Sequence, residues 1–305
     1  MSHQPTLAAA VDNNIQRTEG ARVIAARFVI AHLAVLGVFF VPFTWQLALA
    51  AFLSYVSRTF VIEGGVHRYF SHRSYKTSRT FQFLLAAAAA SNGQRGAIWW
   101  AVTHRRHHRF ADQAADPHSP VVHSAWKSYF GWLIDDEVLA TRLDEAPDLA
   151  RFPELVWINK HHYVFTLAGL IGTFLIGHYT SLFGATGMCW AAVVWVFFDG
   201  MVASQHMAYG VNAFAHGGRA NFWRARPFKT KDQSTNVWWW ALPSLGGGWH
   251  NNHHRYMNAA RAGFYWWQID VTYWILRGLE RLGIVWDLHE VPQAVLDEGR
   301  KPRVA

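Results

Sequence analysis

Histidines recur at a fixed spacing in two short stretches of this 305-residue chain. Both stretches read His-x-x-His-His, and their histidines are His104, His107, His108, His250, His253 and His254. Because each residue turns a helix by about 100°, positions i, i+3 and i+4 share one face. Each triplet can therefore offer three imidazole nitrogens to a shared centre, which predicts metal binding.

A third stretch contains His67 and His72, which are separated by five positions. An ideal helix does not place such a pair on one face, so we expect a helix end to aim both inward. Together the three stretches supply eight imidazoles. A structural zinc usually recruits Cys to a four-ligand site, and Cys189 is the single Cys of the chain, so the histidines predict two ions with larger ligand sets.

Charged residues are missing from two long stretches of the chain. No Asp, Glu, Lys or Arg occurs from Phe28 to Ser57 or from His161 to Phe198. At about 20 residues per membrane-spanning helix, each stretch can hold two passes if the helices extend slightly beyond it. The expected spans are residues 23–41, 44–62, 163–179 and 188–207.

The positions of the basic residues predict the orientation of these spans. All 28 Lys and Arg lie outside the two uncharged stretches, and four spans place the segments that carry them on one side. By the positive-inside rule that side is cytoplasmic. We predict an all-α, multi-pass integral membrane domain over residues 1–305 with both termini cytoplasmic. A polar segment (1–21) and a cytoplasmic helical cap (63–160 and 208–305) would complete it, and the cap would hold the histidines.

Composition excludes several other classes of protein. Hydrophobic residues make up 51% of the chain and charged residues 16%, whereas disordered chains are poor in aromatics and rich in charge. A single Cys excludes an internal disulfide and an iron–sulfur cluster held by thiolates. The net charge of +8 lies beside predicted spans, which favours a membrane surface over a nucleic acid as the partner.

Two further segments are expected at the membrane surface. The apolar stretch from Thr80 to Gln94 is too short to cross a bilayer, so we expect it along the interface. Near the C-terminus, one helical face would carry Asp270, Arg277 and Arg281, and the opposite face Ile275, Leu276, Leu279 and Leu282. This pattern predicts an amphipathic helix resting on the membrane. Within the first span, His32 is expected to hydrogen-bond to a neighbouring helix.

The membrane setting bears on the identity of the metal. Imidazole suits Fe, Cu, Zn and Ni. An acyl chain is the substrate most available in a bilayer, and activating its C–H bonds requires an oxidant generated from O₂. These considerations favour iron.

The sequence resembles the membrane fatty-acid desaturases, the family of the stearoyl-CoA Δ9 desaturases and their bacterial relatives. The resemblance runs from about Gly37 to Leu288 and is strongest in HRYFSHRSYK, HRRHHRFADQAADPHSP and GWHNNHH. It implies four transmembrane helices, cytoplasmic termini and a cap over a di-iron site. It also implies two additional metal positions, Asn212 and His216 in VNAFAH, with Asn212 reaching its iron through water.

The proposed ligand set is then His67, His72, His104, His107, His108, Asn212, His216, His250, His253 and His254. Metal-bound histidines usually donate their second N–H to an acceptor. Candidates for that supporting role are Glu63, Asp112, Asp116 and His118, although the acidic residues could equally be solvated loop acids. The residues that bind substrate are not identifiable.

Departures from the family pattern leave the acyl carrier open. Animal acyl-CoA members have Arg-Asp before the second histidine stretch, where this chain has Val102-Thr103. Glycines occupy 246–248, where the family usually has Gly-Glu-Gly. The resemblance implies an O₂-dependent desaturase with two iron ions that forms a cis double bond, commonly Δ9, with acyl-CoA as the first-choice substrate. Alternatives are an acyl-lipid desaturase and a hydroxylase on the same scaffold. The chain has no haem or flavin motif, so electrons must come from a separate ferredoxin- or haem-type protein with its reductase.

Overall fold

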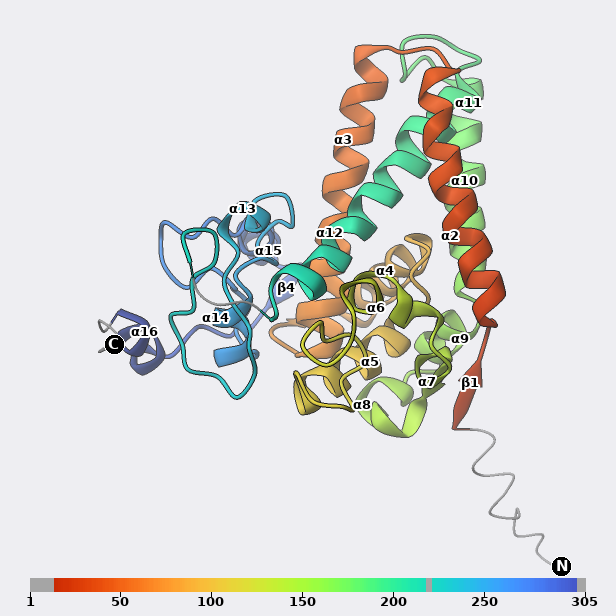
Figure 1. Ribbon diagram of the computed structural model, residues 1–305. Coiled ribbons are helices and arrows are strands. Elements are labelled where there is room, and N and C mark those ends of the chain that lie inside the picture. Colours follow the sequence, from red (N-terminus) through yellow and green to blue (C-terminus); the bar gives the residue numbers. More distant parts are fainter. Residues whose placement is uncertain (1–13, 218–220, 301–305) are drawn as a thin grey trace, which may run out of the picture.

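The computed structural model describes residues 14–217 and 221–300 as a mostly helical protein. Four long helical segments stand side by side and form one end of the molecule (Figure 1). They are α2 (Ala21–Val35) with its 3₁₀ extension Leu36–Phe39, α3 (Trp45–Phe60) with its π-helical extension Val61–Ser71, α10 (His162–Tyr179), and α11 (Cys189–Ala192) continuing through the π-helical segment Val193–Asp199 into α12 (Gly200–Phe214).

Two of these segments, Ala21–Phe39 and Trp45–Ser71, are long and apolar enough to cross a membrane. Their outward surface is apolar, with Leu33 60% and Phe52 59% exposed. Helix α10 covers residues 163–179, the third predicted span, and the helix that ends with α12 covers nearly all of the fourth, 188–207, and continues to Phe214. Exposed leucines on α10, such as Leu167, give it a similar outward surface. The four-span topology itself stays a prediction.

Short helices build the opposite end of the molecule, which contains the histidine stretches (Figure 1). They are α4 (Arg79–Ser91), α5 (Ala97–Phe110), α6 (Ala125–Tyr129), α7 (Asp136–Leu139), α8 (Pro147–Ala150), α9 (Pro153–Lys160), α13 (Trp238–Ala241), α14 (His250–Arg255), α15 (Val271–Arg281) and α16 (Gln293–Arg300), with 3₁₀ turns at Gly131–Ile134 and Leu143–Glu145. A core of buried Leu, Ile, Val and Ala side chains joins α4, α5 and α9 to the π-helical end of α3.

Two small antiparallel sheets depart from the all-helical prediction. Strand β1 (Ile15–Arg17) pairs with β3 (Ala140–Arg142), and β2 (Lys76–Thr77) pairs with β4 (Val285–Trp286). Each sheet joins parts of the chain that are distant in sequence, so the strands connect segments of a helical fold.

The predicted amphipathic helix near the C-terminus is present as α15, but the prediction that its apolar face rests on the membrane is wrong for most of that face. Leu276 of α15 is fully buried and, with Leu279, packs into the protein core. Leu282, after the helix, is 73% exposed. An amphipathic pattern identifies the apolar face of a helix but not whether lipid or protein covers it.

His32 contacts a neighbouring helix, as predicted. Its Nε2 lies 2.9 Å from Nε2 of His206 on α12, and His206 Nδ1 lies 2.6 Å from the Tyr129 hydroxyl. The Phe28 carbonyl accepts from His32 Nδ1. These contacts join α2, α12 and the cap helix α6.

Candidate metal centre

The nine predicted histidines converge into two adjacent groups in the interior of the cap. Cluster A comprises His67, His72, His104, His108 and His253, and cluster B comprises His107, His216, His250 and His254. Within each cluster, one ring nitrogen of every histidine lies within 4.8 Å of the corresponding nitrogen of every other member. Nε2 atoms face one another at 2.8 Å between His72 and His104, and at 2.9 Å between His216 and His250.

A π-helical winding brings His67 and His72 together. The helix that begins as α3 widens over Val61–Ser71, and His72 caps its end. In a π-helix the backbone bonds run from i to i+5, so residues five apart come close to alignment. The two rings lie 5.2 Å apart between centroids. The two histidines come together at a helix end, as expected, because the α-helix changes there to a π-helix.

The two His-x-x-His-His triplets each serve both clusters, which corrects the prediction of one shared centre per triplet. On α5, His104 and His108 belong to cluster A and His107 to cluster B. On α14, His253 belongs to cluster A, whereas His250 and His254 belong to cluster B. Positions i and i+4 stack along one line of the helix surface, and position i+3 lies to one side of that line. A triplet can therefore reach two centres that lie next to each other.

Carboxylates hold the second ring nitrogen of four cluster histidines. Glu63 is 3.0 Å from Nδ1 of His67, and Asp116 is 2.9 Å from Nδ1 of His107. These contacts require the proton on Nδ1, which leaves the Nε2 lone pair free for a metal. The predicted acceptors Glu63 and Asp116 are thus placed at histidines rather than in solvent.

Two loop aspartates make the equivalent contacts at two other histidines of cluster B. Asp112 lies 3.1 Å from Nδ1 of His216, and Asp232 lies 2.9 Å from Nδ1 of His254. Asp232 was missed by the sequence analysis because it lies in a polar Lys-Thr-Lys-Asp run without a fixed spacing to His254. The two lysines just before Asp232, Lys229 and Lys231, are the weak signal that this run offers.

Burial disfavours the charged form of several cluster histidines. It lowers the pKa values of His72, His104, His108, His250 and His253 well below the usual value, and neighbouring histidines lower them further. Burial by itself would raise the pKa of Asp112, but the hydrogen bond and charge of His216 outweigh it and lower that pKa to about 2. Neutral imidazoles backed by ionised carboxylates are the forms that bind a cation.

His118 and Asn212 lie beside the clusters. The His118 ring stacks on that of His107 with centroids 4.4 Å apart, and its Nδ1 is 4.0 Å from Asp116. Asn212 lines a narrow cavity together with His104 and His118. His118 thus packs against a cluster histidine, and the Asn212 amide is near cluster A through that cavity.

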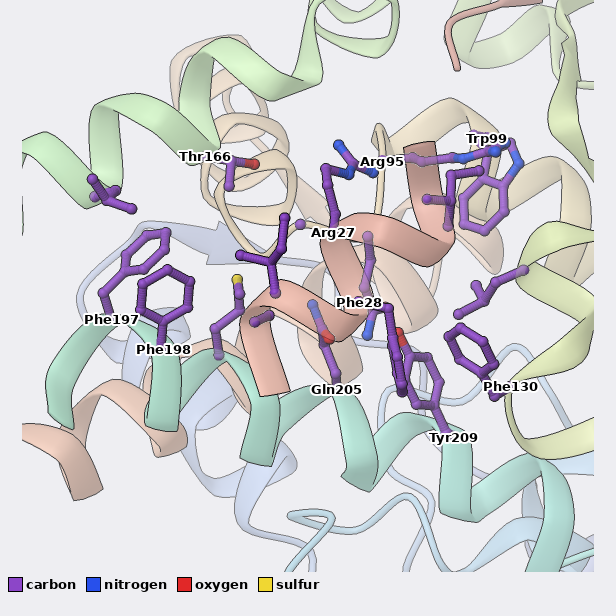
Figure 2. A pocket seen from close by; sticks show the side chains of 18 residues that line it. Arg27, Phe28, Arg95, Trp99, Phe130, Thr166, Phe197, Phe198, Gln205 and Tyr209 are labelled. Carbon is purple, nitrogen blue, oxygen red and sulfur yellow. The ribbon is translucent and has the colours of Figure 1, made fainter. Parts of the chain in front are cut away.

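A larger apolar cavity of about 170 Å³ lies among α2, α10, α12 and the cap (Figure 2). Phe28, Phe197 and Tyr209 contribute to its wall, and Arg27 and Arg95 are its charged lining residues. Trp99 borders this cavity and also the narrow one beside His104. The two spaces therefore share Trp99 as a wall residue.

Comparison with known proteins gives a consistent result. A family model for fatty acid desaturases matches residues 43–286. The chain is 35% identical over 251 residues to a hex-5-enoyl-[acyl-carrier protein] acetylenase of Moorena producens, covering 78% of this chain and 74% of that protein. It is 34% identical over 267 residues to Delta-9 acyl-lipid desaturase 2 of Arabidopsis thaliana, covering 87% and 81%.

A third relative differs in its acyl carrier. The acyl-CoA C20 Delta5-desaturase of Anemone leveillei is 32% identical over 262 residues, covering 83% of this chain and 77% of that protein. Relatives whose names give different acyl carriers and different double-bond positions are thus about equally identical to this chain. With the family match and the paired histidine clusters, they show that this chain belongs to the fatty acid desaturase family and is an oxidoreductase that acts on acyl chains.

Proposed function

We propose that this protein is an O₂-dependent desaturase that introduces a cis double bond, Δ9 by first choice, into a saturated fatty-acyl chain. In this proposal it spans the membrane four times, with both termini and the histidine clusters on the cytoplasmic side. The observation that carries the proposal is the pair of clusters A and B, next to an apolar cavity that suits an acyl chain.

The donor set fits two iron ions. Nine imidazoles present their nitrogens in two groups, and no thiolate competes, because Cys189 lies near the far end of the helices. Cluster A would hold one ion and cluster B the other, with Asn212 nearby. When bound, the iron supplies the O₂-dependent oxidising power that removing hydrogens from two unactivated methylenes requires.

The residues of the chain position the reactants. Glu63, Asp112, Asp116 and Asp232 fix the protons of their histidines on Nδ1. The cavity of Figure 2 takes the apolar chain, and Arg27 and Arg95 in its wall suit a polar head group. Arg95 Nη2 is buried without a hydrogen-bond partner among the described residues. The indoles of Trp99 and Trp132 stack on each other beside His118, and Trp99 forms part of the wall of the acyl cavity.

Lipid profiling tests this function. The chain is expressed in a host that lacks a desaturase, beside a His253→Ala control, and fatty acids are analysed by mass spectrometry. We expect new monounsaturated chains with the intact protein alone, and the double-bond position follows from fragmentation. Hydroxylated chains would replace the proposal with the hydroxylase alternative.

The acyl carrier needs a separate measurement. We propose acyl-CoA first, and an acyl lipid is the second candidate because Δ9 acyl-lipid desaturases are among the relatives. Purified protein is supplied with saturated acyl-CoA or with saturated phospholipid, together with a reducing system. Product from phospholipid alone would overturn the acyl-CoA assignment.

A further inference from the structure

A solvent-open hollow of about 470 Å³ lies against the clusters. Its wall includes His108 of cluster A and His254 of cluster B. It shares no lining residue with the apolar cavity of Figure 2, so the two spaces are separate.

The two histidines in this wall are the members of the clusters nearest to solvent. His108 is the one partly exposed residue of cluster A and His254 that of cluster B, although the His254 side chain itself is only 2% exposed. Their rings stack with centroids 4.4 Å apart and an interplanar angle of 27°. A molecule seated in the hollow is therefore separated from each cluster by one imidazole.

The rim of the hollow is positively charged. Arg109, Lys229 and Lys231 line it and are exposed. The carboxylates of the wall are engaged within the protein, because Asp232 contacts His254 and Glu298 pairs with Arg255. The exposed surface around the two histidines thus presents cations, which attract an acidic partner.

We propose that this hollow is the docking site of an acidic one-electron carrier protein that reduces the metal centre, an inference that rests on the proposed function. Forming one double bond removes two electrons and two protons from the acyl chain. One O₂ takes up these two electrons and two protons, together with two electrons from the carrier and two protons from solvent, and becomes two molecules of water. A one-electron carrier must therefore bind and leave twice per turnover.

A charged rim suits a carrier protein that must bind briefly and repeatedly. Small redox interfaces are weak, and opposite charges raise their association rates without slowing dissociation as buried contacts do. A hollow with exposed Arg109 and Lys229 has this character, and electrons arriving there are next to both clusters through His108 and His254.

Direct binding tests the site. The probe is an acidic plant-type [2Fe–2S] ferredoxin, titrated against the detergent-solubilised full chain with and without metal. The double variant Arg109→Gln/Lys229→Gln is compared with Arg151→Gln/Lys160→Gln, which removes two exposed cations away from the hollow. We expect about tenfold weaker binding for the first variant and unchanged binding for the second. Binding of the wild type should weaken as salt increases.

A chemical reductant separates docking from chemistry. When the enzyme is reduced with dithionite and mixed with O₂ and acyl substrate, Arg109→Gln/Lys229→Gln should form as much product per chain as the wild type. With ferredoxin, its KM for ferredoxin should rise about tenfold at nearly constant kcat.

Equal ferredoxin binding by both double variants, or binding that does not respond to salt, would overturn the docking site. Absence of product from the dithionite-reduced wild type would instead overturn the proposed function. A small acidic haem protein serves as a second probe. If it alone shows the charge-dependent binding, the site is supported and the carrier is of the haem class.

Discussion

Clusters A and B are built from the same residue type but are supported differently. Among the described residues, cluster A has five histidines and one carboxylate contact, from Glu63. Cluster B has four histidines, and three of them contact aspartates. The aspartates give cluster B a higher negative charge and fix its imidazoles directly, whereas the imidazoles of cluster A are oriented mainly by the helices that carry them.

This difference indicates that the two ions should respond unequally to perturbation. Nearby carboxylates stabilise a bound cation and orient its ligands. We therefore expect the ion of cluster B to be held more tightly, and cluster A to depend on how accurately α5, α14 and the π-helical segment are packed.

The largest effect should come from removing one histidine from either cluster. His253→Ala in cluster A and His107→Ala in cluster B should each lower desaturation more than about 100-fold, because loss of a ligand costs more than loss of its supporting carboxylate. Iron analysis of the purified proteins should show the deficit at one ion, while membrane insertion persists. Full activity of either variant would contradict the two-cluster assignment.

Removing a carboxylate from cluster B should have the next largest effect. Asp116→Asn keeps the shape of the side chain but weakens its hold on Nδ1 of His107. Metal affinity or activity should fall about 10–100-fold. Glu137→Gln is the matched control, because Glu137 is an exposed acid that pairs with Arg106. Equal losses in both variants would indicate a general effect of charge.

Chelation can rank the two ions. During titration with a chelator, about half of the iron should leave first, and Glu63→Gln should accelerate that phase about tenfold. Asp232→Asn should accelerate the slower phase instead. A single phase unaffected by Glu63→Gln would show that the carboxylates do not distinguish the clusters.

The smallest effect concerns the packing behind cluster A. Arg105, next to His104, donates to Asp148 and to the Ser71 carbonyl next to His72. Burial alone would raise the pKa of Asp148, but its hydrogen bond and ion pair with Arg105 lower that pKa to about 2 from 3.8. The ion pair therefore stabilises the fold above about pH 4, and this contribution is lost as the pH falls towards 2.

At neutral pH, Asp148→Asn should lower the free energy of unfolding by about 1 kcal/mol, because solvent screens this partly exposed pair. Thermal unfolding of the metal-free proteins measures the difference, which should vanish near pH 2. A constant difference across the pH range would mean that ionisation of Asp148 does not stabilise the fold.

Much of the site could be predicted from the sequence, because helical periodicity relates spacing to direction. The eight histidines of the three stretches followed from spacing, and His216 from the family resemblance. The division of each triplet between two centres could not be predicted, since it depends on where the neighbouring helices lie. Asp232 reaches His254 through tertiary folding of an irregular loop, which carries no period.

Prediction of the fold from the sequence has the same limit, because it too depends on tertiary packing. Uncharged stretches predicted the positions of the long helices, but the burial of Leu276 depends on what covers α15. A hydrophobic pattern does not distinguish lipid from protein, because both are apolar surroundings.

The helix from Trp45 to Ser71 runs without interruption from the far end of the molecule into cluster A, carrying Glu63 and His67. This continuity makes the site intolerant of changes in chain length. A loop absorbs an inserted or deleted residue, whereas in a helix each residue adds about 100° of rotation and 1.5 Å of rise. A single deletion between Trp45 and Ile62 would turn His67 away from cluster A, so this segment must keep its length even where its side chains are free to vary.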